Sequence, residues 1–143
     1  MFELMDSLMQ WRASLMMDGR MDDMAREFIF PFALYVGGGW KSFADPDMLA
    51  LCFASTMQSR LNRGIVRMET KVVAMDLPRD GRFRVWVDHN DYAASGLVSD
   101  RYSSVNYCRE TAQGVRTEML HVYPLAGPPE MVSVIDVMAR CSA

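Results

Sequence analysis

The stretch from Ser99 to Pro124 constrains the fold more than any other part of the chain, because it reads as two long strands joined by a tight turn at Gln113 and Gly114. In a two-residue hairpin, every further pair follows by counting outward from the turn. One face then pairs Arg109 with Glu118, Tyr107 with Leu120 and Val105 with Val122. The other face pairs Cys108 with Met119, Asn106 with His121 and Ser104 with Tyr123. We expect the first face, an ion pair among apolar residues, to be an outer or subunit-facing surface, and the second to be the wall of a pocket.

The predicted pocket wall holds a candidate acid–base set. His121 is one of 2 histidines in the chain, and the counted register places Asn106 opposite it and Tyr123 two residues along on the same face. Acid–base chemistry needs a titratable group near the operating pH and donors aimed at a developing oxyanion. We therefore take His121, Asn106 and Tyr123 as candidate catalytic residues. The alternative is a histidine that is merely hydrogen-bonded in a core or an interface, and a one-residue slip of register would turn the whole set outward.

Further residues are candidates for ligand contact, as the walls or the lid of the same pocket. They are Tyr35, Trp40, His89, Tyr102, Cys108 and Met119. Asp88 and His89 are neighbours on a predicted strand, so they point to opposite faces and only one of them can line the pocket. The alternatives are aromatic residues that fill a core or an interface, a solvated strand end at His89, and a buried, inert thiol at Cys108.

Apolar spacing and capping residues predict three helices before the main sheet. The first covers residues 2–18, and the second is short, from a cap at Asp22 or Asp23 to Phe28. The third covers residues 46–62 with Asp45 as its N-cap and proline at its first position. The predicted buried stripes are Leu4, Leu8, Trp11 and Leu15 in the first helix and Leu49, Phe53, Met57 and Leu61 in the third.

Turn residues mark the other strands. Residues 32–36 and 40–43 are expected to form a short hairpin around the glycine triplet 37–39, which lacks the Gly-Lys-Ser/Thr continuation of a phosphate loop. Asp80-Gly81 joins strands over 65–77 and 82–92. Counting outward pairs Ala74 with Val87, Val72 with His89, Met75 with Trp86 and Val73 with Asp88. Residues 130–140 fit either a strand or a helix.

Composition narrows the function classes. A chain of 143 residues suits one domain, and its net charge of −3 argues against a nucleic-acid partner. No apolar run approaches the ~20 residues of a membrane helix, and no signal core follows the N-terminus. Cys52, Cys108 and Cys141 show no metal-ligand spacing, so we expect a reduced, cytoplasmic chain without metal or cofactor. The 14 methionines fit an adaptable core or, as the alternative, a methionine-lined pocket.

The order of elements resembles the nuclear-transport-factor-2-like superfamily, and within it the polyketide-cyclase-like (SnoaL-like) branch. The resemblance covers about residues 2–125 and rests on FIFPFALYVGGGWKSFADPDMLALCF, the helix stop LNRG and the closing GVRTEMLHVY, with Val115 where the commoner pattern has a tryptophan. It implies a cone whose strands wrap a small cavity, and dimerisation through the outer face of the sheet. Enzymes of this superfamily move a proton next to a carbonyl with a carboxylate or a histidine, while tyrosine or aspartic acid stabilises the enolate.

The patterns and the resemblance together predict one α+β domain over residues 1–143. We expect a cone-shaped, cystatin-like roll with three N-terminal helices packed on a strongly curved antiparallel sheet, and a C-terminal extension from about residue 126. The predicted function is binding of a small hydrophobic molecule in the cavity, with cofactor-independent isomerase, dehydratase or cyclase chemistry as its catalytic form. The alternatives are a non-catalytic dimerisation or interaction module and the small structural subunit of a ring-hydroxylating oxygenase. We expect a homodimer through the outer sheet face and no nucleic-acid or membrane partner.

Overall fold

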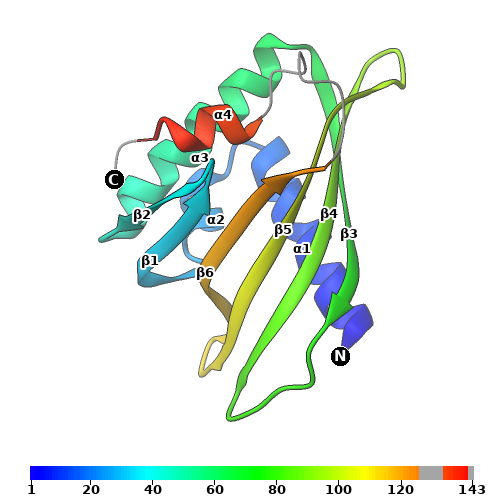
Figure 1. Cartoon of the computed structure of the whole chain (residues 1–143). Helices are drawn as coiled ribbons and strands as arrows, with labels where there is room; N and C mark the ends of the chain where they lie inside the picture. The colour runs from blue at the N-terminus through cyan, green and yellow to red at the C-terminus, as the bar shows by residue number, and fades with distance from the viewer. Residues whose placement is uncertain (126–133, 142–143) are drawn as a thin grey trace.

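The computed structural model describes residues 1–125 and 134–141, which form an α+β roll (Figure 1). The helices are α1 (Phe2–Met17), α2 (Met21–Ala25), α3 (Pro46–Asn62) and α4 (Val134–Ala139). The strands are β1 (Phe28–Val36), β2 (Gly39–Phe43), β3 (Ile65–Met75), β4 (Arg82–Ala93), β5 (Val98–Thr111) and β6 (Gly114–Pro124). They form one strongly curved sheet in the order β2-β1-β6-β5-β4-β3, with the helices on one side of it. The predicted fold class is confirmed, except that β1 pairs with β6 in parallel.

Helix α3 begins and ends where the sequence predicts. Asp45 has an extended backbone and its Oδ1 accepts a hydrogen bond from the backbone N–H of Met48 at 3.0 Å, which satisfies one of the free amides of the first turn. The predicted buried stripe is confirmed at its first three positions. It is wrong at Leu61, whose exposed fraction is 55%, because Arg60 takes the buried position instead.

The first two helices differ from the prediction in face and extent. Leu4 and Trp11 are 63% and 44% exposed, so the predicted apolar stripe of α1 is wrong at both positions. The buried face of α1 carries Met5, Met9, Arg12, Ala13, Leu15 and Met16. Helix α2 begins after Arg20 and ends before Phe28, so Asp22 and Asp23 lie in its first turn and do not cap it.

The register of the β5–β6 hairpin differs from the count, because its turn is one residue earlier than predicted. Thr111 pairs with Gly114, and the Thr111 hydroxyl closes the turn by accepting from Gln113 N–H at 3.1 Å and donating to the Gly114 carbonyl at 2.7 Å. A bulge then shifts the register again between Tyr107 and Cys108. Asn106 therefore pairs with Leu120, and His121 pairs with Val105. The predicted pairs of this hairpin are wrong, and His121 and Asn106 lie on opposite faces.

The β3–β4 hairpin keeps its predicted turn but not its predicted pairs. Asp80 and Gly81 have φ of 50° and 75°, and Arg79 bridges Arg82 as the two-residue turn requires. Counting away from the turn, the register shifts between Arg79 and Met75 and again at a bulge between Val72 and Ala74. As a result, the pairs are Ala74 with Trp86, Val72 with Val87, Met75 with Val85 and Thr70 with His89.

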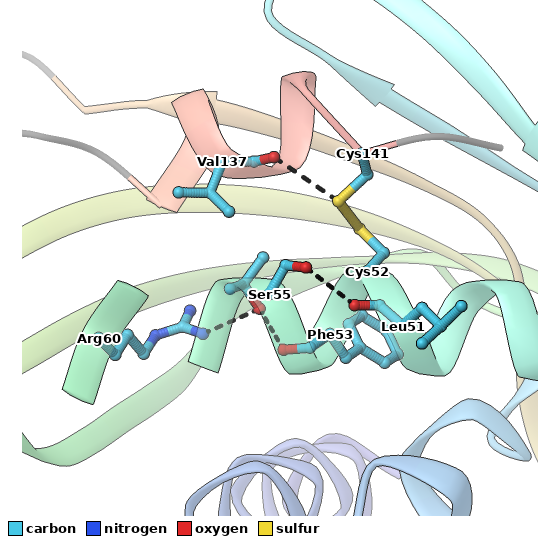
Figure 2. The surroundings of a disulfide bond; sticks show 8 residues. Leu51, Cys52, Phe53, Ser55, Arg60, Val137 and Cys141 are labelled. Atoms are coloured by element: carbon cyan, nitrogen blue, oxygen red, sulfur yellow. Dashed lines mark hydrogen bonds between the residues drawn. A yellow bond between two sulfur atoms is a disulfide. The ribbon is translucent and has the colours of Figure 1, made fainter. Parts of the chain in front are cut away.

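A disulfide joins the C-terminal segment to the body of the domain. Cys52 of α3 and Cys141, which follows α4, have Cα atoms 5.5 Å apart and form a disulfide across 89 positions of sequence (Figure 2). The expectation that the cysteines are all reduced is therefore wrong, because the packing of α4 on α3 brings together two thiols that the sequence separates. Cys108 is free and buried. Within the C-terminal extension, residues 134–139 are helical, and residues 130–133 lie outside the described residues.

The buried hydrophobic side chains form two clusters. The larger is centred on α3, β1 and β6 and includes Phe32, Phe43 and Leu49. The smaller lies between α1 and the β3–β4–β5 part of the sheet and includes Met5, Val85 and Cys108. None of the helices in the described part of the chain is long and apolar enough to cross a membrane.

Candidate functional site

A cavity of about 80 Å³ lies between the helices and the inner face of the sheet. Its apolar wall is rich in methionine and comes from α1, α2, β3 and α4: Met9, Met16, Met24, Met68 and Met138. The other apolar residues of that wall are Ala13, Phe28, Phe53, Leu120 and Val122. Methionine side chains are flexible, so they can adjust the shape of this cavity.

One wall of the cavity is polar and is centred on His89. The Nε2 atom of His89 lies 2.8 Å from Ser104 Oγ, and the imidazole stacks on the ring of Tyr102 with centroids 4.4 Å apart and planes 6° apart. Among the described residues, Nδ1 of His89 has no hydrogen-bond partner. The cavity therefore holds one imidazole that is fixed on one edge and free on the other.

The electrostatics of the cavity keep His89 neutral. Burial, and after it the positive charge of Arg60, lower the pKa of His89 from its ordinary 6.5 to about 3. A general base works best with a pKa close to the operating pH, so this imidazole is poorly matched to proton abstraction near neutrality. It is well matched to hydrogen bonding as a neutral group.

A hydrogen-bonded chain runs from Ser104 to the buried Arg12. Asn106 Nδ2 donates to Ser104 Oγ at 3.3 Å, and Asn106 Oδ1 accepts from the Thr117 hydroxyl at 3.3 Å. Thr117 Oγ1 in turn accepts from Arg12 Nη1 at 2.8 Å. All four of these residues are nearly inaccessible to solvent, so the chain is isolated from competing water.

Arg12 is held by carbonyl and carboxylate oxygens at the start of β1. Its Nη2 donates to the backbone carbonyl of Glu27 at 3.2 Å, and its Nε lies 3.5 Å from Glu27 Oε1. Burial lowers the pKa of Arg12, while Glu27 works in the opposite direction. The ion pair keeps a charge inside the domain, where an unpaired one would be strongly destabilising.

A second buried ion pair closes the far side of the cavity. Arg60 Nε donates to Asp91 Oδ2 at 2.9 Å, and Arg60 Nη2 donates to the Tyr102 hydroxyl at 2.8 Å. Burial alone would lower the pKa of Arg60, but Tyr102 and the Asp91 carboxylate outweigh it and the pKa rises. Burial raises the pKa of Tyr102 to about 12, so its hydroxyl stays protonated.

Thr70 adds a polar group that the protein itself does not satisfy. It pairs with His89 across β3 and β4, lines the cavity and is 8% exposed. Within the described part of the chain its Oγ1 has no hydrogen-bond partner. A buried hydroxyl without a partner costs free energy of about 1–3 kcal/mol, which a bound molecule can relieve.

The structure brings only part of the predicted site together. His89, Tyr102 and Asn106 line the cavity, as predicted. The prediction that His121 and Tyr123 face the interior is wrong: His121 is exposed, and both lie on the outer face of the sheet beside Tyr35. The bulge at Glu118 is the cause, because it reverses the faces of the β6 residues that follow it.

The other predicted contact residues lie away from the cavity. Tyr35 and Trp40 are 42% and 61% exposed on the outer face. Met119 lies two residues before His121 on the same outer face, and Cys108 is buried in the smaller core cluster. Glu118 does lie within 3.7 Å of Arg109, as predicted for an outer-face ion pair, and within 3.2 Å of Arg82.

Sequence reasoning placed Ser104 on the pocket wall but missed the other residues that organise the cavity: Arg12, Arg60, Thr70 and Thr117. A weak indication of Arg12 was available, because it lies among Met9, Ala13 and Met16 on a helix. The described residues hold no group of three or more histidine, cysteine or acidic side chains suited to a metal ion.

Comparison with known proteins identifies the fold. No family model matches the chain, and no curated protein matches it in sequence. A domain of unknown function with a cystatin-like fold from Nostoc punctiforme superposes with a TM-score of 0.68 at 12% identity, over 87% of this chain and 77% of that chain. An NTF2-like protein with a cystatin-like fold from Novosphingobium aromaticivorans gives 0.57 at 13% identity, over 90% and 84%. The chain has the nuclear-transport-factor-2-like fold.

A third solved structure with the same fold is that of a protein similar to an enzyme. A ketosteroid isomerase-like protein from Erwinia carotovora atroseptica superposes with a TM-score of 0.58 at 13% identity, over 81% of this chain and 89% of that chain. Similarity at this level of identity shows the fold. The polyketide-cyclase-like branch stays a prediction.

Proposed function

We propose that this protein binds a small, largely apolar molecule in the cavity between α1, α3 and the inner face of the sheet. The observation that carries the proposal is a methionine-rich cavity whose polar wall has free hydrogen-bonding capacity at His89 and Thr70. Binding sites for small molecules are mostly apolar with a few placed polar groups, and this cavity has that composition.

The cavity limits the size of the ligand. Its volume of about 80 Å³ is below the ~300 Å³ of a drug-sized site and about half of the ~150 Å³ apolar cavity that accommodates benzene. A five- or six-membered ring therefore exceeds the cavity as it stands and enters only when the methionine side chains move apart.

The pKa of His89 supports binding over acid–base catalysis. With a pKa of about 3, the only histidine in the cavity is a weak base near neutral pH, although it can still donate a hydrogen bond. The isomerase, dehydratase or cyclase chemistry predicted from the sequence relied on His121, which lies on the other face of the sheet.

The proposal is tested by filling the cavity. Ala13 lines it from α1, while Ser14 is the next residue and is exposed. We expect calorimetric titration with cyclopentanone to show saturable binding to the wild type and to Ser14→Leu, but none to Ala13→Leu, because the leucine adds three carbon atoms to the cavity. Equal affinity of the two variants, or no binding to the wild type, would refute the proposal.

Association through the outer face of the sheet is the second candidate function. Tyr35 and Trp40 are paired on that face and are 42% and 61% exposed, and His121 and Tyr123 continue the aromatic surface onto β6. An exposed cluster of aromatic residues is typical of an interface. We expect sedimentation velocity to show a homodimer that Trp40→Ser dissociates and Trp11→Ser, on α1, leaves intact; a wild-type monomer would refute it.

The disulfide between Cys52 and Cys141 bears on the cellular location of the protein. The sequence predicts a cytoplasmic chain, and the observation against it is the disulfide between Cys52 and Cys141, because cytosolic thiols are kept reduced. Because the cysteines are buried, cells are quenched with acid, the protein is denatured, and its free thiols are then alkylated and counted by mass measurement. Three labelled cysteines fit a reducing compartment, and one labelled cysteine fits an oxidising one.

A further inference from the structure

The hydrogen bonds between Arg12 and His89 have defined donors and acceptors, and Arg12 is the first donor. A guanidinium has only donors, so in the contact between Arg12 Nη1 and Thr117 Oγ1 the threonine oxygen accepts. The Thr117 hydroxyl then donates its own proton to Asn106 Oδ1, 3.3 Å away, while the thiol of Cys108, at 3.8 Å, can donate to the threonine oxygen. Arg12 therefore orients the Asn106 amide through Thr117.

The orientation of Asn106 determines what Ser104 does. With Oδ1 engaged by Thr117, Asn106 presents Nδ2, which donates to Ser104 Oγ at 3.3 Å. The remaining contact of Ser104 Oγ is with His89 Nε2 at 2.8 Å, and the described residues offer the serine proton no other acceptor. Ser104 therefore donates to Nε2, and a neutral His89 carries its proton on Nδ1.

We infer that Arg12 is a positioning residue that acts through Thr117, Asn106 and Ser104 to keep the proton of His89 on Nδ1, so that the cavity offers its ligand an N–H donor. The consequence for the ligand rests on the proposed function. A cavity that offers an N–H donor binds a molecule with a lone-pair acceptor, such as an ether or carbonyl oxygen. The inference on the tautomer itself rests only on the hydrogen-bonded chain.

Two features around the ring support this assignment. Nδ1 of His89 has no partner among the described residues, and His89 lines the cavity, so that an N–H at Nδ1 is available to an acceptor there. Thr70 Oγ1, from the neighbouring strand, is also without a partner there and supplies a second hydroxyl donor. The low pKa of His89 keeps the ring neutral at physiological pH, which a single tautomer requires.

Imidazole ¹⁵N NMR tests the tautomer directly, and the chain holds only 2 histidines. We expect His89 of the wild type at pH 7.5 to show a protonated Nδ1 and an unprotonated Nε2; a protonated Nε2 would overturn the inference. His121→Gln assigns the signals.

Asn106→Asp tests the long-range control. A carboxylate accepts from both Thr117 and Ser104, so that Ser104 turns its proton away from His89 and the ring must donate from Nε2. We expect the proton to move to Nε2 in this variant and to stay on Nδ1 in the control Thr70→Val, which alters the cavity but not the chain. Thr117→Val removes the link to Arg12 and is expected to raise the Nε2-protonated fraction. If Asn106→Asp or Thr117→Val folds and its His89 nitrogen shifts equal those of the wild type, the role of Arg12 is overturned.

A pair of probes tests the ligand class. Cyclopentanone and methylenecyclopentane have the same shape, but only the ketone has a lone-pair acceptor. We expect the wild type to bind the ketone roughly tenfold more tightly, as one hydrogen bond allows, and Asn106→Asp to show a smaller preference, since the Thr70 hydroxyl remains as a donor. Equal affinities in the wild type would overturn the acceptor preference while leaving small-molecule binding intact. Binding of neither probe would overturn the proposed function and, with it, the ligand class, and the nitrogen shifts would still decide the tautomer.

Discussion

Acidification should destabilise this protein through His89 before its carboxylates titrate. The pKa of His89 is about 3 in the folded protein, against an ordinary value of 6.5. Between these values the unfolded chain binds one proton more than the folded one, so the stability linked to His89 is fully present above pH 6.5 and is lost as the pH falls toward 3.

The magnitude follows from the size of the shift. Within the window, one proton corresponds to about 1.4 kcal/mol of unfolding free energy per pH unit. Between pH 7.5 and pH 5.5 the expected loss is about 1.4 kcal/mol in total, because half of that interval lies above 6.5, where little changes. His89 is half-buried, and solvent weakens the effect of burial on its pKa, so this loss of unfolding free energy is an upper value.

Urea unfolding of the wild type, His89→Gln and His121→Gln at both pH values measures the effect. Glutamine is neutral throughout, so His89→Gln should lose the pH-dependent step even where the substitution itself lowers stability. His121 is exposed on the outer face, and His121→Gln should keep the step. The same pH dependence in wild type and His89→Gln would refute the reasoning.

Three other perturbations have expected outcomes. Asp91→Asn leaves the buried Arg60 without its carboxylate and should cost about 3–5 kcal/mol in urea unfolding; a loss below about 1 kcal/mol would show that the pair is dispensable. Cys141→Ser opens a loop that spans 89 positions, and the chain-entropy model gives about 4.6 kcal/mol; equal stability of the variant and the wild type under non-reducing conditions would contradict the disulfide. Asp45→Ala removes the cap of α3 and should cost about 0.5–2 kcal/mol by the same assay, unless the helix is held by packing alone.

Local signals determined what the sequence could predict. Helix α3 carries its own cap, first-turn proline and terminal glycine, and its predicted bounds are confirmed. The fold class followed from the order of such elements. Each of these features depends on residues close together in the chain, which a single sequence displays.

The register of the hairpins could not be predicted in this way. Gly114 suggested the centre of a turn, but the side chain of Thr111 stabilises a turn one residue earlier. That change moves each cross-strand partner by two positions and leaves the faces as predicted, whereas the bulge at Glu118 moves the partners back by one position. A shift of one position exchanges the two faces of a strand. The bulge therefore moved His121 from the predicted cavity wall to the outer face.

The polar half of the cavity depends on residues that are distant in the sequence. Arg12 contacts Thr117 across 105 positions, and Arg60 contacts Asp91 across 31. Charged side chains are rarely buried without partners, and the partners become visible only in the fold. The disulfide between Cys52 and Cys141 was missed for the same reason.

Methionine methyl NMR tests the central claim, that the cavity binds a small molecule, most directly. Among the residues that the structure describes, five methionines line the cavity, namely Met9, Met16, Met24, Met68 and Met138, whereas Met119 lies on the outer face of the sheet. With ¹³C-methyl-labelled methionine and increasing cyclopentanone, the account predicts saturable shifts of the five cavity signals and a constant Met119 signal. Cavity signals that stay constant at every concentration, or a shift confined to Met119, would contradict it.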